Sequence, residues 1–215
     1  MLFVGGAVRT IAYIDGFNLY YGSVKDTPHK WLDLYALFRN TLPAECTLLQ
    51  VKYFTARVSA LPHDPDAPRR QDVYLRALRA HLGQAIEIIE GHFSVKHVMA
   101  PLSANPRVFH RIIKTEEKGS DVNLAVELVH DAWKDAFDCA AVVSNDADLT
   151  RALKITKQDR KKKVFLYTPG APVRTPLPSL KRWANKTFPI TSAVVAAAQL
   201  PAVIPGTTLA KPATW

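Results

Sequence analysis

The sequence has few cysteines and no long apolar run, and both absences exclude classes of protein. Its two cysteines, Cys46 and Cys139, lie far apart and match no zinc-ligand spacing, so neither a disulfide framework nor a zinc site is expected. No apolar run approaches the ~20 residues that span a bilayer. The opening MLFVGGAVRT also lacks the charged start and the apolar stretch of a secretory signal. These absences predict a cytoplasmic protein that does not contact a membrane.

Acidic residues are outnumbered, and the excess of basic residues is concentrated in one segment. Lysine and arginine total 28 against 19 aspartates and glutamates, which gives a formal charge of +9. Seven of the cations fall between residues 151 and 163, with one acid among them: Arg151, Lys154, Lys157, Arg160, Lys161, Lys162 and Lys163. This run predicts a positive surface that attracts phosphate backbones. A solvated helix end, whose dipole favours basic residues, explains the run equally well.

The chain of 215 residues, 48% of them apolar, is long enough to bury one substantial core. We expect one domain over residues 1–190. From 191 to 215 the chain becomes rich in Ala, Pro and Thr, which predicts a tail or linker. No internal repeat is visible, and association of the chain into a homo-oligomer is left open.

Short apolar, β-branched segments alternate with segments of helical periodicity. Strands are predicted over 10–15, 47–56, 85–93, 108–115, 139–144 and 163–168, with a short edge strand over 188–191; helices are predicted over 31–42, 69–83, 121–133, 146–158 and 178–186. Such alternation predicts an α/β fold, a three-layer sandwich in which helices cover both faces of a mostly parallel sheet.

Three of these segments carry more specific expectations. In the helix over 121–133, Ser120 is well placed as the N-terminal cap. Apolar residues at helical spacing predict its buried stripe: Val122, Ala125, Val126, Val129 and Trp133. The two strands on either side of the Pro- and Asn-containing stretch predict an extended hairpin or arm over residues 90–115.

Four aspartates lie where the predicted strands end or where a helix begins. Asp15 ends the first strand, Asp121 opens the clearest helix, and Asp146 and Asp148 follow the strand at 139–144. Ligands of open parallel sheets gather beyond the carboxyl ends of the strands, so acids from distant segments can converge there. One such Asp is ordinary, because Asp also caps helices, but capping requires only one acid of the run SNDAD.

A cluster of carboxylates is most simply explained by bound metal, because the carboxylates would otherwise repel one another. Oxygen ligands select Mg²⁺ or Mn²⁺, which can activate water and stabilise a phosphodiester during cleavage. Polar residues beside the acids could hold waters or orient the carboxylates: Asn18, Asn123, Ser144 and Asn145.

Three blocks, IAYIDGFNLYYG (11–22), EEKGSDVNLAVELV (116–129) and VVSNDADLTRALK (142–154), resemble the signature blocks of the NYN family. This PIN-like group includes LabA-type proteins. The resemblance covers residues 10–190, and the three blocks occur in the same order as in the family. It implies a PIN-like fold, a Mg²⁺ or Mn²⁺ site and action on RNA, with Asp15, Asp121, Asp146 and Asp148 as acidic ligands. Ala147 and Leu149 depart from the residue types common in the family, but leave the acids untouched.

The combined hypothesis is a metal-dependent endoribonuclease that acts on single-stranded or structured RNA. Lys118, Arg151, Lys154 and Lys157 are the candidate contacts to the RNA backbone. A rival hypothesis is an RNA-binding or regulatory module with little turnover. A phosphatase with Asp15 as its nucleophile is disfavoured, because that chemistry needs a second acid two residues later and position 17 is Phe. The histidines show no paired metal-ligand spacing.

Overall fold

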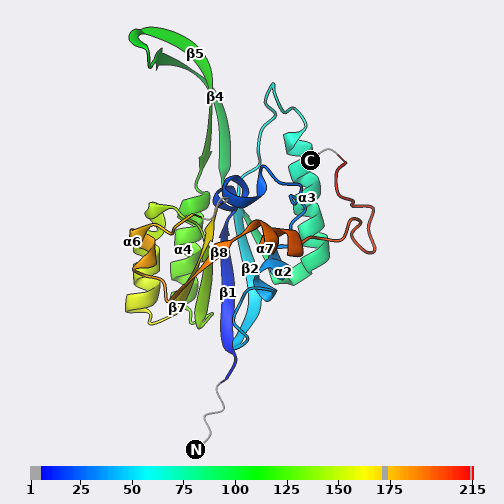
Figure 1. Cartoon of the computed structure of the whole chain (residues 1–215), viewed down its shortest axis with the longest axis vertical. Helices are drawn as coiled ribbons and strands as arrows, with labels where there is room; N and C mark the ends of the chain where they lie inside the picture. The colour runs from blue at the N-terminus through cyan, green and yellow to red at the C-terminus, as the bar shows by residue number, and fades with distance from the viewer. Residues whose placement is uncertain (1–5, 171–173, 214) are drawn as a thin grey trace, which may run out of the picture.

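The computed structural model describes residues 6–170, 174–213 and 215. Residues 1–5, which belong to the predicted domain, lie outside the described residues, as do 171–173 and 214. The molecule has three layers, with a six-stranded parallel sheet between two layers of helices (Figure 1), so the predicted α/β fold is confirmed. The strand order is β3-β2-β1-β6-β7-β8. The bounds are β1 (Val8–Asp15), β2 (Cys46–Thr55), β3 (Ile86–Glu90), β6 (Cys139–Val143), β7 (Lys163–Pro169) and β8 (Lys186–Ile190).

The order of the strands places a topological switch point between β1 and β6. From β1 the chain winds outward through β2 and β3 on one side, and β6, β7 and β8 continue on the other. The register pairs Ile14 of β1 with Val143 of β6, so both strands end at the same level. Ligand sites of open α/β sheets lie at such a point, beyond the carboxyl ends of the strands.

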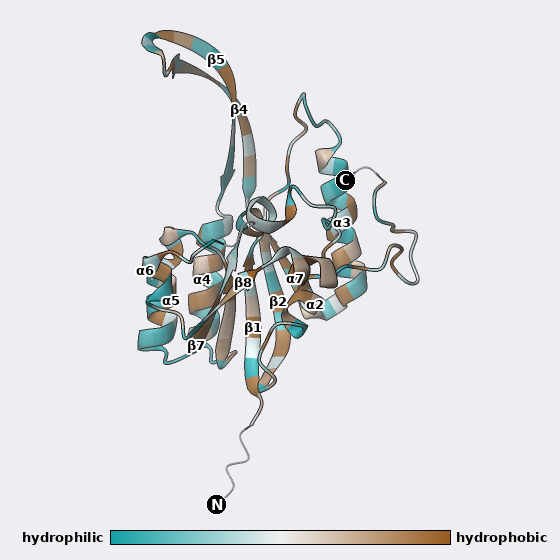
Figure 2. Ribbon diagram, in the orientation of Figure 1, coloured by the Kyte–Doolittle hydropathy of each residue, from teal (hydrophilic) through white to brown (hydrophobic). Residues whose placement is uncertain are grey.

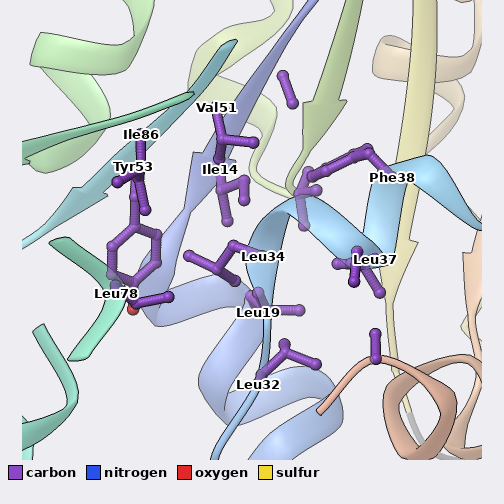
Figure 3. Close-up of a cluster of buried hydrophobic side chains, with 14 of the residues drawn as sticks. Ile14, Leu19, Leu32, Leu34, Leu37, Phe38, Val51, Tyr53, Leu78 and Ile86 are labelled. Atoms are coloured by element: carbon purple, nitrogen blue, oxygen red, sulfur yellow. The ribbon is translucent and has the colours of Figure 1, made fainter. Parts of the chain in front are cut away.

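Each face of the sheet is covered by its own helices because alternate residues of each strand point to opposite faces. One layer contains α1 (Gly16–Leu19), η1 (Tyr20–Val24), α2 (Leu34–Arg39), α3 (Ala67–Leu82), the short η2 (Gly83–Ala85) and α7 (Ser192–Ala197). The other contains α4 (Ser120–Trp133), η3 (Ala147–Leu149), α5 (Thr150–Lys154), η4 (Ile155–Asp159) and α6 (Pro178–Lys181). Figure 3 shows the core of the first layer, where Leu34, Leu37 and Phe38 pack with Ile14 and Val51.

Helix α4 packs on the sheet with only part of the predicted stripe. Ala125 and Val129 lie partly buried against the core, but the other three predicted members, Val122, Val126 and Trp133, are 58%, 59% and 60% exposed. The fully buried apolar residues are instead Leu124, Leu128 and Ala132. Both sets are apolar at helical spacing, so periodicity alone could not choose between them. Ser120 is the first helical residue rather than the cap. The preceding Gly119 has a φ of 91°, and the Ser120 amide donates to the Glu117 carboxylate.

An antiparallel hairpin of β4 (His92–Leu102) and β5 (Asn105–Lys118) rises from the carboxyl edge of the sheet, where the sequence predicts an arm (Figure 1). The predicted strand over 85–93 is broken at Gly91, so that β3 joins the central sheet and β4 begins the arm. Figure 2 shows hydrophobic and hydrophilic segments alternating along it, and both Met99 and Phe109 are largely exposed.

The segment after Thr191, predicted as a tail or linker, packs against the domain. It forms α7 and then runs beside the loop before α2, where the Leu200 amide donates to the Trp31 carbonyl. The Trp31 indole donates to the Pro201 carbonyl, and Leu200 and Ile204 are buried. This packing depends on tertiary contacts that local composition does not reveal. None of the helices within the described ranges has the length and apolarity that crossing a membrane requires.

Candidate active site

Asp15 is the last residue of β1 and lies buried at the switch point, with 6% of its surface exposed. Its carboxylate accepts hydrogen bonds from the Asn18 backbone amide at 2.9 Å and the Asn18 side-chain amide at 3.0 Å. It also accepts from the hydroxyl of Ser144 at 3.1 Å. Asp15 thus caps α1, as an Asp at such a position often does, but it also joins the end of β6.

The turn after Asp15 is tight enough to require glycine at the next position. A Cβ atom on Gly16 would lie 2.6 Å from the carbonyl oxygen of Phe54 and 2.8 Å from the ring of Tyr53. Helix α1 therefore starts directly against the end of β2. This close approach holds Asp15 in one place at the edge of the sheet.

The loop after β6 completes the site from the other side of the switch point. Ser144 is fully buried and its hydroxyl oxygen accepts from the Asp146 amide at 3.1 Å, so one side chain connects Asp15 to Asp146. The Asn145 amide donates to the Asn18 side-chain oxygen at 3.2 Å. The Asp146 carboxylate accepts from the Asp148 amide at 2.9 Å. The structure therefore gathers these predicted residues around the ends of β1 and β6.

The electrostatics of Asp15 are those of a site that would gain from a cation. Burial raises the pKa of Asp15 above its ordinary value, and the nearby Asp146 raises it further, while the hydrogen bonds from Asn18 and Ser144 oppose the shift. A positive ion beside both carboxylates would offset burial and repulsion together.

The other predicted ligands are placed less closely. The carboxylate of Asp121, at the start of α4, accepts from the Val122 amide, and Asp148 is exposed. Asn123 lies one residue beyond Val122 on the same helix. Over residues 6–170, 174–213 and 215, no three Asp, Glu, His or Cys side chains form a metal-binding group. Sharing of one ion by all four aspartates stays a prediction.

The oxygen donors that do come together nevertheless fit a hard divalent cation. Asp15 and Asp146 supply carboxylates, and the Ser144 hydroxyl oxygen lies between them. The Asn18 side-chain nitrogen donates to Asp15, while its oxygen accepts from the Asn145 amide. Mg²⁺ commonly uses one or two carboxylates and keeps several waters or substrate oxygens. Asp15 and Asp146 would leave the remaining positions of Mg²⁺ or Mn²⁺ to water or substrate.

The predicted basic run does not form one free surface beside the acids. In the register of β6 and β7, Lys163 lies beside Cys139, at the end of these strands that is opposite the site. The basic run therefore extends away from the site along α5 and η4. Lys157 donates to the Ala184 carbonyl, and Lys162 pairs with Asp135. Of the other predicted RNA contacts, Arg151 is exposed, Lys154 lies over the Trp183 ring, and Lys118 pairs with Glu116.

A buried charged cluster on β1, β2 and α4 escaped the sequence analysis. The Lys52 ammonium lies 2.7 Å from the Asp131 carboxylate and 2.8 Å from that of Glu127, and the Tyr13 hydroxyl donates to Asp131 at 2.7 Å. Burial alone would lower the pKa of Lys52, but its contacts with Asp131 and Glu127 raise it. The sequence signal was Lys52, a lysine between Val51 and Tyr53 in a predicted strand.

A cavity of about 250 Å³ next to Asp15 was missed as well. Gly16 and Phe17 form part of its wall, together with Tyr20 and Tyr21. The sequence signal was the aromatic density of the segment FNLYY, which begins two residues after Asp15.

The sequence model of the NYN domain family matches residues 9–190, which is most of the chain. This chain belongs to the NYN domain family. The three ordered blocks therefore predicted the family correctly. Membership implies a PIN-like nuclease family, whose members typically use a divalent metal ion.

Two individual proteins are also similar to this NYN protein. One is 6-hydroxy-3-succinoylpyridine 3-monooxygenase HspA from Pseudomonas putida, 35% identical over 97% of this chain and 75% of the relative. The other is a crystallised protein of unknown function from Vibrio parahaemolyticus, with a TM-score of 0.55 and 18% identity. That likeness covers 93% of this chain and all of the other, and it supports the fold alone.

Proposed function

We propose that this NYN protein is a metal-dependent endoribonuclease that hydrolyses phosphodiester bonds of RNA. The observation that carries the proposal is the junction of β1 and β6 at the switch point, where Ser144 connects the buried Asp15 to the half-buried Asp146. Ligands of open α/β sheets bind at the carboxyl ends of the strands, where these carboxylates lie. Membership in the NYN family, which implies a nuclease, makes phosphodiester cleavage the reaction that suits them.

Asp15 and Asp146 would hold Mg²⁺ or Mn²⁺, with Asp121 and Asp148 contributing directly or through water. When bound, the ion supplies charge stabilisation for the phosphate and lowers the pKa of a water molecule. Asn18 and Ser144 fix the orientation of the Asp15 carboxylate, and Ser144 also fixes the loop that carries Asp146. Lys118, Arg151 and Lys154, near the same edge, would hold the RNA backbone through charge without selecting a base.

The test is incubation of the purified protein with labelled RNA and DNA, single and double stranded, with Mg²⁺, Mn²⁺ or excess chelator. Cleavage of internal RNA bonds is expected only with metal. Equal cleavage in excess chelator would contradict the metal mechanism. Salt-sensitive RNA binding without cleavage under every metal condition would instead favour the rival RNA-binding module.

The role of Ser144 gives a separate prediction. Ser144→Ala removes the hydroxyl that contacts both Asp15 and the Asp146 amide, so the affinity for Mn²⁺ should fall by about 10- to 100-fold, as for groups that orient metal ligands. Isothermal titration with Mn²⁺ and the Mn²⁺ dependence of cleavage measure this change.

Ser23→Ala is a matched control for Ser144→Ala. Ser23 is also buried, donates to the Ile190 carbonyl and accepts from the Gly170 amide. Both variants should lose similar stability, and only Ser144→Ala should lose metal affinity. Equal Mn²⁺ binding by the two variants would show that Ser144 does not orient the site.

A second candidate function follows from the HspA relative and from the cavity beside Asp15. The name of that relative describes oxygenation of a hydroxypyridine, and an aromatic cavity of about 250 Å³ is an observation that favours a small ring-shaped ligand. Monooxygenation consumes dioxygen and two electrons from a donor. Incubation with 6-hydroxy-3-succinoylpyridine, NADH and added flavin, followed by mass spectrometry, tests this candidate. Absence of dioxygen uptake and of oxygenated product counts against it.

A further inference from the structure

Seven aromatic side chains from distant parts of the chain contribute to the wall of the cavity beside Asp15. It has a volume of about 250 Å³, just below the ~300 Å³ at which pockets for drug-sized ligands begin. A space of this size suits one ring system. The aromatic lining residues are Phe17, Tyr20, Tyr21, Tyr53, Phe93 and Trp215, together with the buried Tyr74.

Three of these rings lie nearly parallel in a row. The ring centroids of Phe17 and Phe93 are 6.4 Å apart with an interplanar angle of 9°, and those of Phe17 and Tyr21 are 6.4 Å apart at 19°. Phe93 comes from the base of the arm, whereas Phe17 and Tyr21 follow β1. Neither Phe17 nor Phe93 is fully buried, and Tyr21 is 60% exposed, so each of these side chains keeps surface that a ligand can contact.

The position and charge of the cavity connect it to the acidic site. Gly16 and Phe17, which line it, directly follow Asp15. Lys25 and Lys30 also line it, and the Lys25 ammonium lies 5.2 Å from the centroid of the Tyr21 ring. Asp64, its one acidic lining residue among those described, is bound by Arg70 at 2.6 Å. The free charge of the lining is therefore positive and favours a polyanion.

We infer that this aromatic cavity binds one unpaired nucleobase of a single-stranded RNA whose backbone passes Asp15 and Asp146. The inference rests on the proposed nuclease function for the position of the backbone. Single strands are held by stacking of splayed bases on aromatic rings, and this stacking tolerates any base. Binding of a base beside the acids would place the adjoining phosphodiester at the site.

The test compares two fluorescent oligoribonucleotides of equal length, one normal and one with abasic residues throughout. They carry the same phosphate charges and differ in their bases. Their dissociation constants are measured by fluorescence anisotropy in excess chelator, so that no cleavage occurs. The proteins are the wild type, Phe17→Leu, Phe93→Leu and the matched control Trp133→Ala, which removes an exposed aromatic ring from the opposite helix layer. Leucine keeps apolar bulk in the wall and removes the ring face.

The wild type should bind the normal strand about tenfold more tightly than the abasic strand, a ratio that ~1.4 kcal/mol of stacking produces. Each leucine variant should lower that ratio toward one without weakening binding of the abasic strand, and Trp133→Ala should retain it. A ratio near one in the wild type, or an unchanged ratio in both leucine variants, overturns the inference.

The outcomes separate this inference from the proposed function. Suppose the protein cleaves RNA with metal but binds the normal and the abasic oligoribonucleotides equally. That result would support the nuclease function and contradict base binding in the cavity. A base-dependent ratio that Phe17→Leu and Phe93→Leu abolish, in a protein that cuts no RNA with any metal, would retain the cavity and reject the nuclease.

Discussion

Asp15→Asn is expected to lower metal-dependent RNA cleavage by about 10²-fold or more, the range found when a group that stabilises a transition state is removed. Asparagine has nearly the same shape and still accepts the hydrogen bond from the Asn18 amide. What is lost is the negative charge beside Asp146, and with it the attraction for a divalent cation. The second oxygen, which accepts from the Asn18 side-chain amide and the Ser144 hydroxyl, is also replaced by an NH₂ group. Initial rates of RNA cleavage at saturating Mn²⁺, compared with those of the wild type, measure the effect.

Asp159→Asn is the control for this substitution, because it makes the same chemical change at an exposed acid. Asp159 is the last residue of η4, which leads away from the carboxyl ends of the strands. It should cleave RNA at the wild-type rate. If Asp15→Asn cleaves as fast as Asp159→Asn while both remain folded, Asp15 does not take part in catalysis. Thermal unfolding of both variants checks that the fold is retained.

Lys52→Met is expected to lower the free energy of unfolding by about 3–5 kcal/mol, the cost of breaking a buried ion pair from one side. Methionine keeps most of the side-chain volume, so the loss comes mainly from charge. Asp131, only 7% exposed, would keep a carboxylate without its ammonium partner. Urea unfolding monitored by circular dichroism gives the free energy.

Arg57→Met provides a comparison at the surface. Arg57 also contacts two carboxylates, those of Asp72 and Glu90, but its side chain is 43% exposed, so its loss should cost less than about 1 kcal/mol. Adding Asp131→Asn to Lys52→Met should recover much of the lost stability because the unpaired charge is removed. A loss for Lys52→Met no larger than that for Arg57→Met would contradict a stabilising role of the cluster.

The same cluster predicts a dependence on alkaline pH. The pKa of Lys52 is raised in the folded protein, so the folded state holds this proton more tightly than the unfolded state does. Its contribution to stability is therefore complete below the unfolded pKa of about 10.4 and is lost as the pH rises through the higher folded value. Lys52→Met should lack this alkaline component.

The sequence predicted the strands well because a buried parallel strand is a short apolar run that few other elements imitate. The segments at 10–15, 139–144 and 163–168 all fall within or beside β1, β6 and β7. Their order and the acids at their ends predicted the edge at which Asp15 and Asp146 meet. In contrast, the contacts among Asp15, Ser144 and Asp146 depend on register and could not be read from spacing.

Helix α4 shows the limit of periodicity. Its sequence carries apolar residues on two faces, and the face that packs includes Asp131 because Lys52 and Tyr13 lie opposite it on the sheet. The sequence pattern of one helix does not show which side chains of the sheet will lie opposite that helix, because those side chains come from strands distant in the chain. The sequence therefore predicted the helix correctly, but only part of the face that packs on the sheet.

The sequence by itself determined the α/β class, the NYN family and the acids at the ends of β1 and β6, because apolar period and ordered motifs are local properties of a chain. Only the tertiary structure decided which acids are neighbours, how the basic run is distributed, and that Phe17, Phe93 and Trp215 line one cavity. The physical reason is that hydrogen bonds, ion pairs and cavities depend on distances between residues remote in sequence, and chain folding sets those distances.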